Sequence, residues 1–127
     1  MIKYIMKLSI IFILSLFSNL SSLHGYEKAE AFMVYLFEDR VKVLSPKNYH
    51  KNQSVIIENK TLTKVIGKIR NESGKVLKYV NIRPGEFKSV EVVIAKGHNI
   101  YFVPMVPSFQ EVILSFGKRS YEVPSKK

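Results

Sequence analysis

Residues Leu62–Ile82 read LTKVIGKIRNESGKVLKYVNI, and this stretch decides the fold class. The odd positions from 65 to 69 hold Val, Gly and Ile, whereas the even positions from 64 to 70 hold Lys, Ile, Lys and Arg. This period of two is typical of a strand with one buried face. Asn71–Gly74 ends in a glycine, which supplies the positive φ that hairpin loops require, and Lys75–Ile82 returns as the partner strand. Gly67, which has no side chain, indicates a bulge or a close approach of another backbone.

The rest of the chain after residue 30 repeats this rhythm of short β-type runs separated by turn residues. Pro104 and Pro107 interrupt one apolar run, so residues 104–107 are expected to form an irregular loop or a sheet edge rather than a central strand. The expected strands are Ala31–Phe37 and Arg40–Leu44 (one strand with a break or two short strands), Ser54–Glu58, Leu62–Arg70, Lys75–Ile82, Phe87–Ile94, Ile100–Val103, Glu111–Phe116 and Arg119–Val123.

Short strands spaced by about 8–12 residues are typical of an all-β, antiparallel β-sandwich or small barrel. No gap between them is long enough for the helical crossovers of a parallel β/α fold. We expect one immunoglobulin-like β-sandwich domain over residues 26–127. The prediction depends on strand rhythm alone, because the tryptophan and the cysteine pair of immunoglobulin domains are absent.

The first 25 residues have the features of a secretory signal peptide. Lys3 and Lys7 form a positive segment, Leu8–Phe17 is apolar apart from two serines, and Ser18–Gly25 is polar and rich in small residues. The apolar run is shorter than the roughly 20 residues that a membrane-spanning helix needs. We therefore expect a cleaved signal over residues 1–25 and a periplasmic or secreted protein, with an uncleaved anchor as the alternative.

The chain contains no cysteine. A lipoprotein anchor that acylates a cysteine, a disulfide-stapled scaffold and thiolate metal sites are therefore excluded. The apolar core alone must hold the fold together.

The chain is strongly basic. Removal of Lys3 and Lys7 with the leader leaves 18 Lys and Arg residues against 10 Asp and Glu residues, a net charge of +8. Such a charge favours anionic partners such as envelope polymers or lipid headgroups, although it also serves solubility alone. Export argues against a nucleic-acid partner.

Two surfaces are candidates for partner contact. The first is the basic strand face that carries Lys64, Lys68 and Arg70. The second is the segment 101–110, which places apolar side chains beside two prolines in an expected loop, where they either plug the end of the sandwich or form an exposed patch. Its candidate contact residues are Phe102, Pro104, Met105, Pro107 and Phe109.

No metal site, cofactor or catalytic motif is predicted. His50 and His98 lie in polar turns, and with Met105 they are the only candidates for a copper site. The chain lacks the nucleophile elbow of serine hydrolases and the glycine loops that cradle phosphates. We therefore expect a non-catalytic exported module that binds an exported protein or an anionic envelope polymer, with membrane-surface contact compatible with its charge. A copper-handling module is the alternative.

Overall fold

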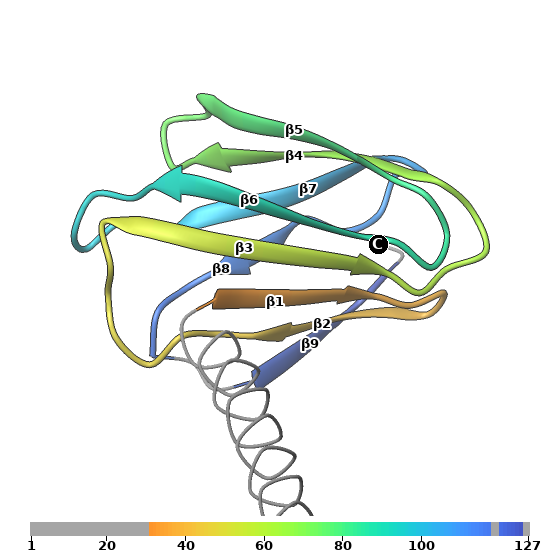
Figure 1. Cartoon of the computed structure of the whole chain (residues 1–127), viewed down its shortest axis with the longest axis horizontal. Helices are drawn as coiled ribbons and strands as arrows, with labels where there is room; N and C mark the ends of the chain where they lie inside the picture. The colour runs from red at the N-terminus through yellow and green to blue at the C-terminus, as the bar shows by residue number, and fades with distance from the viewer. Residues whose placement is uncertain (1–30, 118–119, 126–127) are drawn as a thin grey trace, which may run out of the picture.

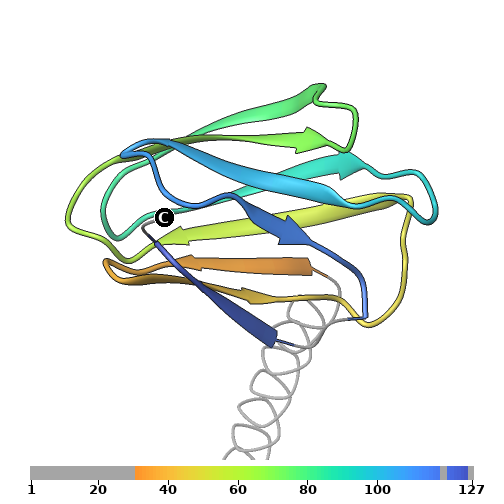
Figure 2. The same ribbon diagram turned by 180° about the vertical axis from the view of Figure 1, so that it is seen from behind.

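The computed structural model describes residues 31–117 and 120–125, which form nine β-strands in two facing sheets (Figure 1). A five-stranded sheet has the order β6-β3-β1-β2-β9, and a four-stranded sheet has the order β5-β4-β7-β8 (Figure 2). The strands are β1 (Ala31–Leu36), β2 (Arg40–Leu44), β3 (Asn52–Asn59), β4 (Val65–Asn71), β5 (Val76–Ile82), β6 (Phe87–Val93), β7 (Ile100–Val106), β8 (Val112–Leu114) and β9 (Ser120–Pro124).

These residues confirm the predicted all-β, sandwich-like architecture. The leader predicted at residues 1–25 lies outside the described residues. Within the described ranges, no helical segment has the length and hydropathy that crossing a bilayer requires.

One apolar core fills the space between the sheets, because alternate residues of most strands point inward. In β4 the buried positions are Val65, Gly67 and Ile69, as the alternation in the sequence predicts. The largest fully buried side chains are Phe32 in one sheet and Phe102 in the other. The buried members of this core are Phe32, Val34, Leu36, Val41, Val43, Val55, Ile57, Val65, Ile69, Val80, Ile82, Val92, Ile94, Ile100, Phe102, Val112 and Leu114.

The polar interruption at residues 38 and 39 separates two strands rather than bending one. The chain reverses after β1, and the backbone N–H of Phe37 donates a hydrogen bond to the carbonyl of Arg40 (2.9 Å). Of the two expected alternatives, two short strands is therefore the correct one.

The prediction that every strand pair is antiparallel is wrong for one pair. β1 runs parallel to β3, with Ala31 opposite Ser54 and Leu36 opposite Asn59. The reason is that β2 folds back on the far side of β1, and the connection 45–51 then returns the chain to the opposite flank of β1. Strand β2 therefore takes the connecting role that helices usually have in parallel pairs.

Of the two alternatives expected at residues 104–107, the irregular loop is wrong for residues 104–106, because β7 continues through Pro104 to Val106 and pairs there with β4. Gly67 pairs with Pro104 and Ile66 with Val106, so Met105 is an extra, bulged residue. Strand β8 pairs only with Ile100–Phe102, which leaves the later half of β7 without a partner on that side. A bulge and a half-open edge are settings in which a sheet tolerates proline.

Gly67 lies at the close approach that the sequence indicates. A Cβ atom on this residue would lie 2.9 Å from two ring carbons of Phe102 and 3.1 Å from the carbonyl oxygen of Val103. The Phe102 ring therefore occupies the space above Gly67, and the register shift between Ile66 and Gly67 is the predicted bulge.

Candidate functional site

The positive charge of the described chain is concentrated on one side of the sandwich. Residues 60–97 carry nine Lys and Arg side chains and three carboxylates. The other described residues carry four Lys and Arg side chains and five carboxylates. Residues 60–97 comprise β4, β5 and β6 with their turns. Because β5 and β6 are edge strands of the two sheets and follow each other in the chain, this basic side covers one flank of the molecule (Figure 1).

A polar surface cleft of about 410 Å³ lies within the basic side. The chain segments around it are the β3–β4 and β5–β6 connections, which lie side by side at one end of the molecule in both Figure 1 and Figure 2. Its lining residues are Lys64, Asn81, Arg83, Glu86 and Lys88.

The pairing of the strands brings these residues together. Val65 pairs with Ile82, so Lys64 and Arg83 are the next residues outward on the two strands of the hairpin. The turn 83–86 then reverses the chain into β6, with Gly85 at a φ of 78°. Lys88 follows as the second residue of β6.

The three cations of the cleft have no ionic partner in the described part of the chain. The Lys and Arg side chains that do form ion pairs there are Arg40, Lys60 and Arg70. Like charges that converge on one cleft repel one another, and an anion that enters it relieves the repulsion.

A buried asparagine beneath the cleft fixes the segments that form it. Asn59 is fully buried, and its side-chain amide donates hydrogen bonds to the carbonyls of Thr63 (2.8 Å) and Ile82 (2.9 Å). These carbonyls immediately precede Lys64 and Arg83 in the chain. The Oδ1 atom of Asn59 accepts hydrogen bonds from the backbone N–H and the hydroxyl of Thr61 (3.0 and 2.6 Å).

The backbone of Asn59 also holds the third segment of the cleft. The N–H of Gly85 donates to the carbonyl of Asn59 (2.8 Å), and the N–H of Asn59 donates to the carbonyl of Glu86 (2.9 Å). One residue therefore connects the backbone at positions 63, 82, 85 and 86. The cleft is consequently a constrained surface rather than a chance gathering of lysines.

The predicted basic strand face is divided by its contacts. Arg70 donates to Oε1 of Glu111 (2.7 Å), and its guanidinium lies 4.2 Å from the centre of the Tyr101 ring. Its charge is therefore neutralised within the fold. Lys68 lies half-buried opposite Tyr79, while Lys64 lies apart from both in the cleft.

The apolar candidates of segment 101–110 lie mostly inside the molecule. Phe102 and Pro104 are buried and not accessible to a partner in this structure. Met105, Pro107 and Phe109 are half-buried. The large exposed apolar side chain of this segment is that of Val106, at 58% exposure.

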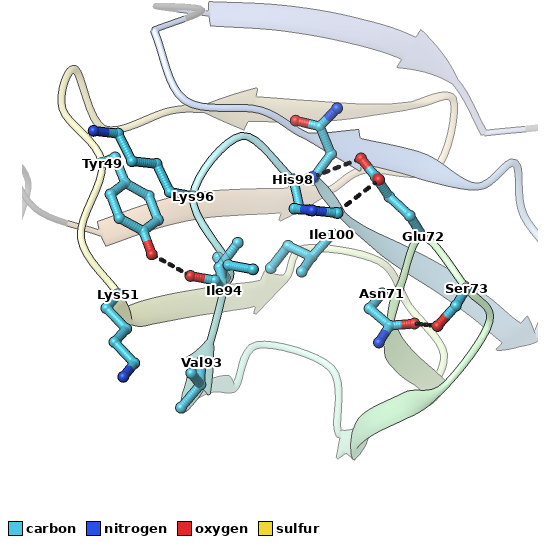
Figure 3. A pocket seen from close by; sticks show the side chains of 12 residues that line it. Tyr49, Lys51, Asn71, Glu72, Ser73, Val93, Ile94, Lys96, His98 and Ile100 are labelled. Carbon is cyan, nitrogen blue, oxygen red and sulfur yellow. Dashed lines mark hydrogen bonds and ion pairs between the residues drawn. The ribbon is translucent and has the colours of Figure 1, made fainter.

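A second, larger cleft of about 780 Å³ lies at the other end of the hairpin (Figure 3). The carboxylate of Glu72 accepts a hydrogen bond from the backbone N–H of Asn99 (2.8 Å) and lies 3.1 Å from Nδ1 of His98. The contact with Asn99, followed by that with His98, lowers the pKa of Glu72 below its ordinary value. The hydroxyl of Tyr49 donates to the carbonyl of Ile94 on the facing wall.

The candidate copper ligands do not converge. His98 precedes β7, whereas Met105 lies five residues after the first residue of that strand, roughly 17 Å further along it. Among the described residues, no group of three or more His, Asp or Glu side chains could hold a metal ion.

Sequence reasoning found Lys64 but missed the rest of the cleft. Arg83 and Lys88 belong to different predicted elements, and nothing in their spacing says that a turn folds them beside Lys64. The signal that could have found the site is the polar pattern of the two connections, Asn59–Lys64 and Arg83–Lys88, which flank a predicted hairpin. Comparisons of the chain with protein-family models, with curated proteins and with solved structures give no significant match.

Proposed function

We propose that this chain is an exported, non-catalytic β-sandwich module that binds an anionic envelope polymer through the basic side formed by β4, β5 and β6. The observation that carries the proposal is the charge asymmetry: with Glu58 and Glu111, which pair with Lys60 and Arg70, this side holds nine cations against five carboxylates, and the rest of the described chain holds four against three. Charge needed only for solubility has no reason to collect on one flank.

A polymer suits this surface better than a small ligand does. The cations are distributed over three strands and their turns, so a chain of repeated anionic groups contacts many of them at once. Each exposed contact is weak and screened by salt, but their sum produces a strong long-range attraction. An exported protein partner would have to present a similarly extended acidic surface.

The proposal of a non-catalytic role is supported by the surroundings of His98. Its imidazole contacts Glu72, but no hydroxyl nucleophile in the described residues is hydrogen-bonded to its other nitrogen. Ser73 instead donates to the side chain of Asn71 (2.8 Å). The pair therefore lacks the third member that nucleophilic catalysis by serine needs.

We also propose that the sandwich is immunoglobulin-like. In immunoglobulin domains strand B pairs with E in one sheet, while C pairs with F and F with G in the other. Here β3 pairs with β6, β4 with β7 and β7 with β8, in the same chain order, and β5 takes the place of C′ beside β4. The departures are the parallel pairing of β1 and the absence of the family's tryptophan and cysteines.

The proposed compartment, periplasmic or secreted, is supported by the leader-like sequence of residues 1–25. Cell fractionation of the full chain tests it. We expect the processed protein outside the cytoplasm, and unprocessed protein in the cytosol would contradict the proposal.

The binding proposal is tested on two matched resins, dextran sulfate and dextran, which share a backbone and differ in charge. We expect protein purified from cells that express the full chain to be retained on dextran sulfate at low salt and released as salt rises. We expect no retention on dextran. Equal behaviour on both resins would contradict the proposal.

Two variants of equal charge test which side binds. The first neutralises Lys68, Lys75 and Lys78 on the basic side, and the second neutralises Lys42, Lys47 and Lys51 elsewhere, all by substitution with Gln. We expect the first variant to leave dextran sulfate at a lower salt concentration than the second. Identical elution would mean that only net charge matters, which would contradict a basic binding side.

A further inference from the structure

We infer that the cleft lined by Lys64, Arg83 and Lys88 is a site for a single tetrahedral phosphate group that carries a proton, such as a phosphate monoester or inorganic phosphate. The inference rests on the proposed function, because it names the anionic group that the basic side recognises. It goes further in assigning this recognition to one cleft.

The charge of the cleft matches a dianion. Three unpaired cations and the carboxylate of Glu86 give the lining a net charge of +2. Hydrogen phosphate is a dianion that still carries one proton, and a phosphate monoester carries about −1.5 to −2 near neutral pH, whereas a carboxylate or a sulfate ester carries about −1. A cleft built for one of the latter would need fewer cations.

The donors of the cleft also suit a tetrahedral oxyanion. The guanidinium of Arg83 offers a planar fork that can contact two phosphate oxygens, while Lys64 and Lys88 act as point charges. Asn81 contributes a neutral amide, on the strand position that pairs with Ile66. The turns that carry these groups are fixed by Asn59, so little ordering is needed on binding.

Glu86 provides the basis for selectivity. An ionised carboxylate can only accept hydrogen bonds, so it repels a fully deprotonated anion but accepts a hydrogen bond from one that keeps a proton. Near neutral pH, inorganic phosphate keeps at least one proton and a monoester, whose second pKa is about 6, keeps one in part, whereas sulfate has none. The cleft should therefore prefer phosphate to sulfate, although the two ions have similar shape and size.

Isothermal titration with sodium phosphate and with sodium sulfate, at constant ionic strength, tests the site. We expect phosphate to bind with one site per chain and sulfate to bind more weakly. In Glu86→Gln, which removes the carboxylate, sulfate should bind more tightly and the preference for phosphate should largely disappear. The absence of phosphate binding, or an unchanged preference in Glu86→Gln, would overturn the inference.

Substitutions of the cations locate the site. Arg83→Gln and Lys88→Gln should each weaken phosphate binding by about tenfold or more, as expected for the loss of a charge-assisted contact. Lys78→Gln, an equal charge change on β5 outside the cleft, should have little effect. All three residues are exposed, so thermal unfolding should show intact folding. An equal effect of Lys78→Gln would mean that phosphate merely responds to overall charge.

Vesicles distinguish the sources of the phosphate group. Phosphatidylcholine vesicles that contain phosphatidate present a monoester on a surface, and binding that depends on Arg83 would identify a lipid headgroup as an accessible source. Binding of inorganic phosphate without such vesicle binding would identify a soluble or polymer-borne group. Salt-sensitive retention on dextran sulfate without any phosphate binding would contradict this inference while leaving the proposed function intact. The absence of both retention and phosphate binding would contradict the inference and the proposed function alike.

Discussion

Asn59 shows how one buried polar residue can organise a surface. Its amide, its side-chain oxygen and its backbone together satisfy groups in three separate segments. Water cannot replace these contacts, because the residue is fully buried. The stability of this end of the sandwich and the shape of the basic cleft therefore depend on the same side chain.

Asn59→Ala should accordingly destabilise the protein by about 3 kcal/mol, because it removes the buried partners of the Ile82 carbonyl and of the Thr61 backbone N–H. Chemical denaturation measures the change. The matched control is Asn71→Ala, which removes an asparagine that organises a partly exposed turn through Ser73 and Lys75. Asn71→Ala should lower the free energy of unfolding by less than about 1 kcal/mol. Equal effects of the two substitutions would contradict the role assigned to Asn59.

We predict that adding a side chain at Gly67 lowers the stability of the fold through a steric clash. Gly67→Ala places a methyl group 2.9 Å from the Phe102 ring, and overpacking of this kind typically costs about 1–3 kcal/mol. The smaller side chain of Phe102→Leu should relieve the clash, so the double variant should lose less stability than the sum of the two single variants. Additive effects in denaturation experiments would show that the ring does not limit this position.

Acid stability should depend on Glu72. Its contacts with Asn99 and His98 lower its folded pKa below the ordinary 4.5, which means that the fold favours the ionised carboxylate. This contribution is present above 4.5 and is lost as the pH falls through the folded pKa. Glu72→Gln should therefore melt below wild type at about pH 6 and approach it at about pH 3. A constant difference in melting temperature across this range would contradict the assignment.

At the scale of elements, β6 is the exposed edge of its sheet. Phe87 and Val93 at its ends are 65% and 61% exposed, and charged residues between them keep the edge from pairing with another chain. Glu91→Val should therefore cause concentration-dependent association, which size-exclusion chromatography detects. Glu86→Val makes the same exchange in a turn and should leave the protein's elution unchanged. Association of both variants would mean that lost charge, rather than the strand edge, is responsible.

The strands show which features the sequence could predict. Positions of β4 follow a strict alternation, because one face contacts the core and the other contacts solvent, so periodicity alone identified its buried residues. Pro104 left a loop and a sheet edge as alternatives, and here a bulge and a missing neighbour allow the proline to lie within a strand. Both conditions depend on Gly67 in β4 and on the short length of β8, which lie far from Pro104 in the chain.

The parallel pairing of β1 and the basic cleft were unpredictable for a related reason. Each depends on which strands become neighbours, and strand order is set by the packing of the whole core rather than by local pattern. Lys64 was identified as a candidate because its own strand alternates. Arg83 and Lys88 acquire their significance only after the turn 83–86 has folded against Asn59.

On the scale of the whole molecule, binding and stability are linked through the basic side. The unpaired cations on this flank repel one another, and a polyanion bound to the folded surface removes that repulsion. Soluble dextran sulfate should therefore raise the melting temperature, with a gain of about 2.7 kcal/mol at a free concentration 100 times the Kd. Neutral dextran at the same mass concentration is the control. Equal melting temperatures in the two polymers would contradict a native-state site.

The position of β1 has a consequence for the order in which the molecule can be completed. This first strand occupies the centre of its sheet, and its neighbour β2 pairs with β9, the last strand of the chain. Strand β2 therefore waits for a partner that is synthesised much later. However the polypeptide leaves the ribosome or crosses a channel, the sheet acquires its outermost strand only after residue 124 has emerged, so the N-terminal strands cannot complete the sheet by themselves.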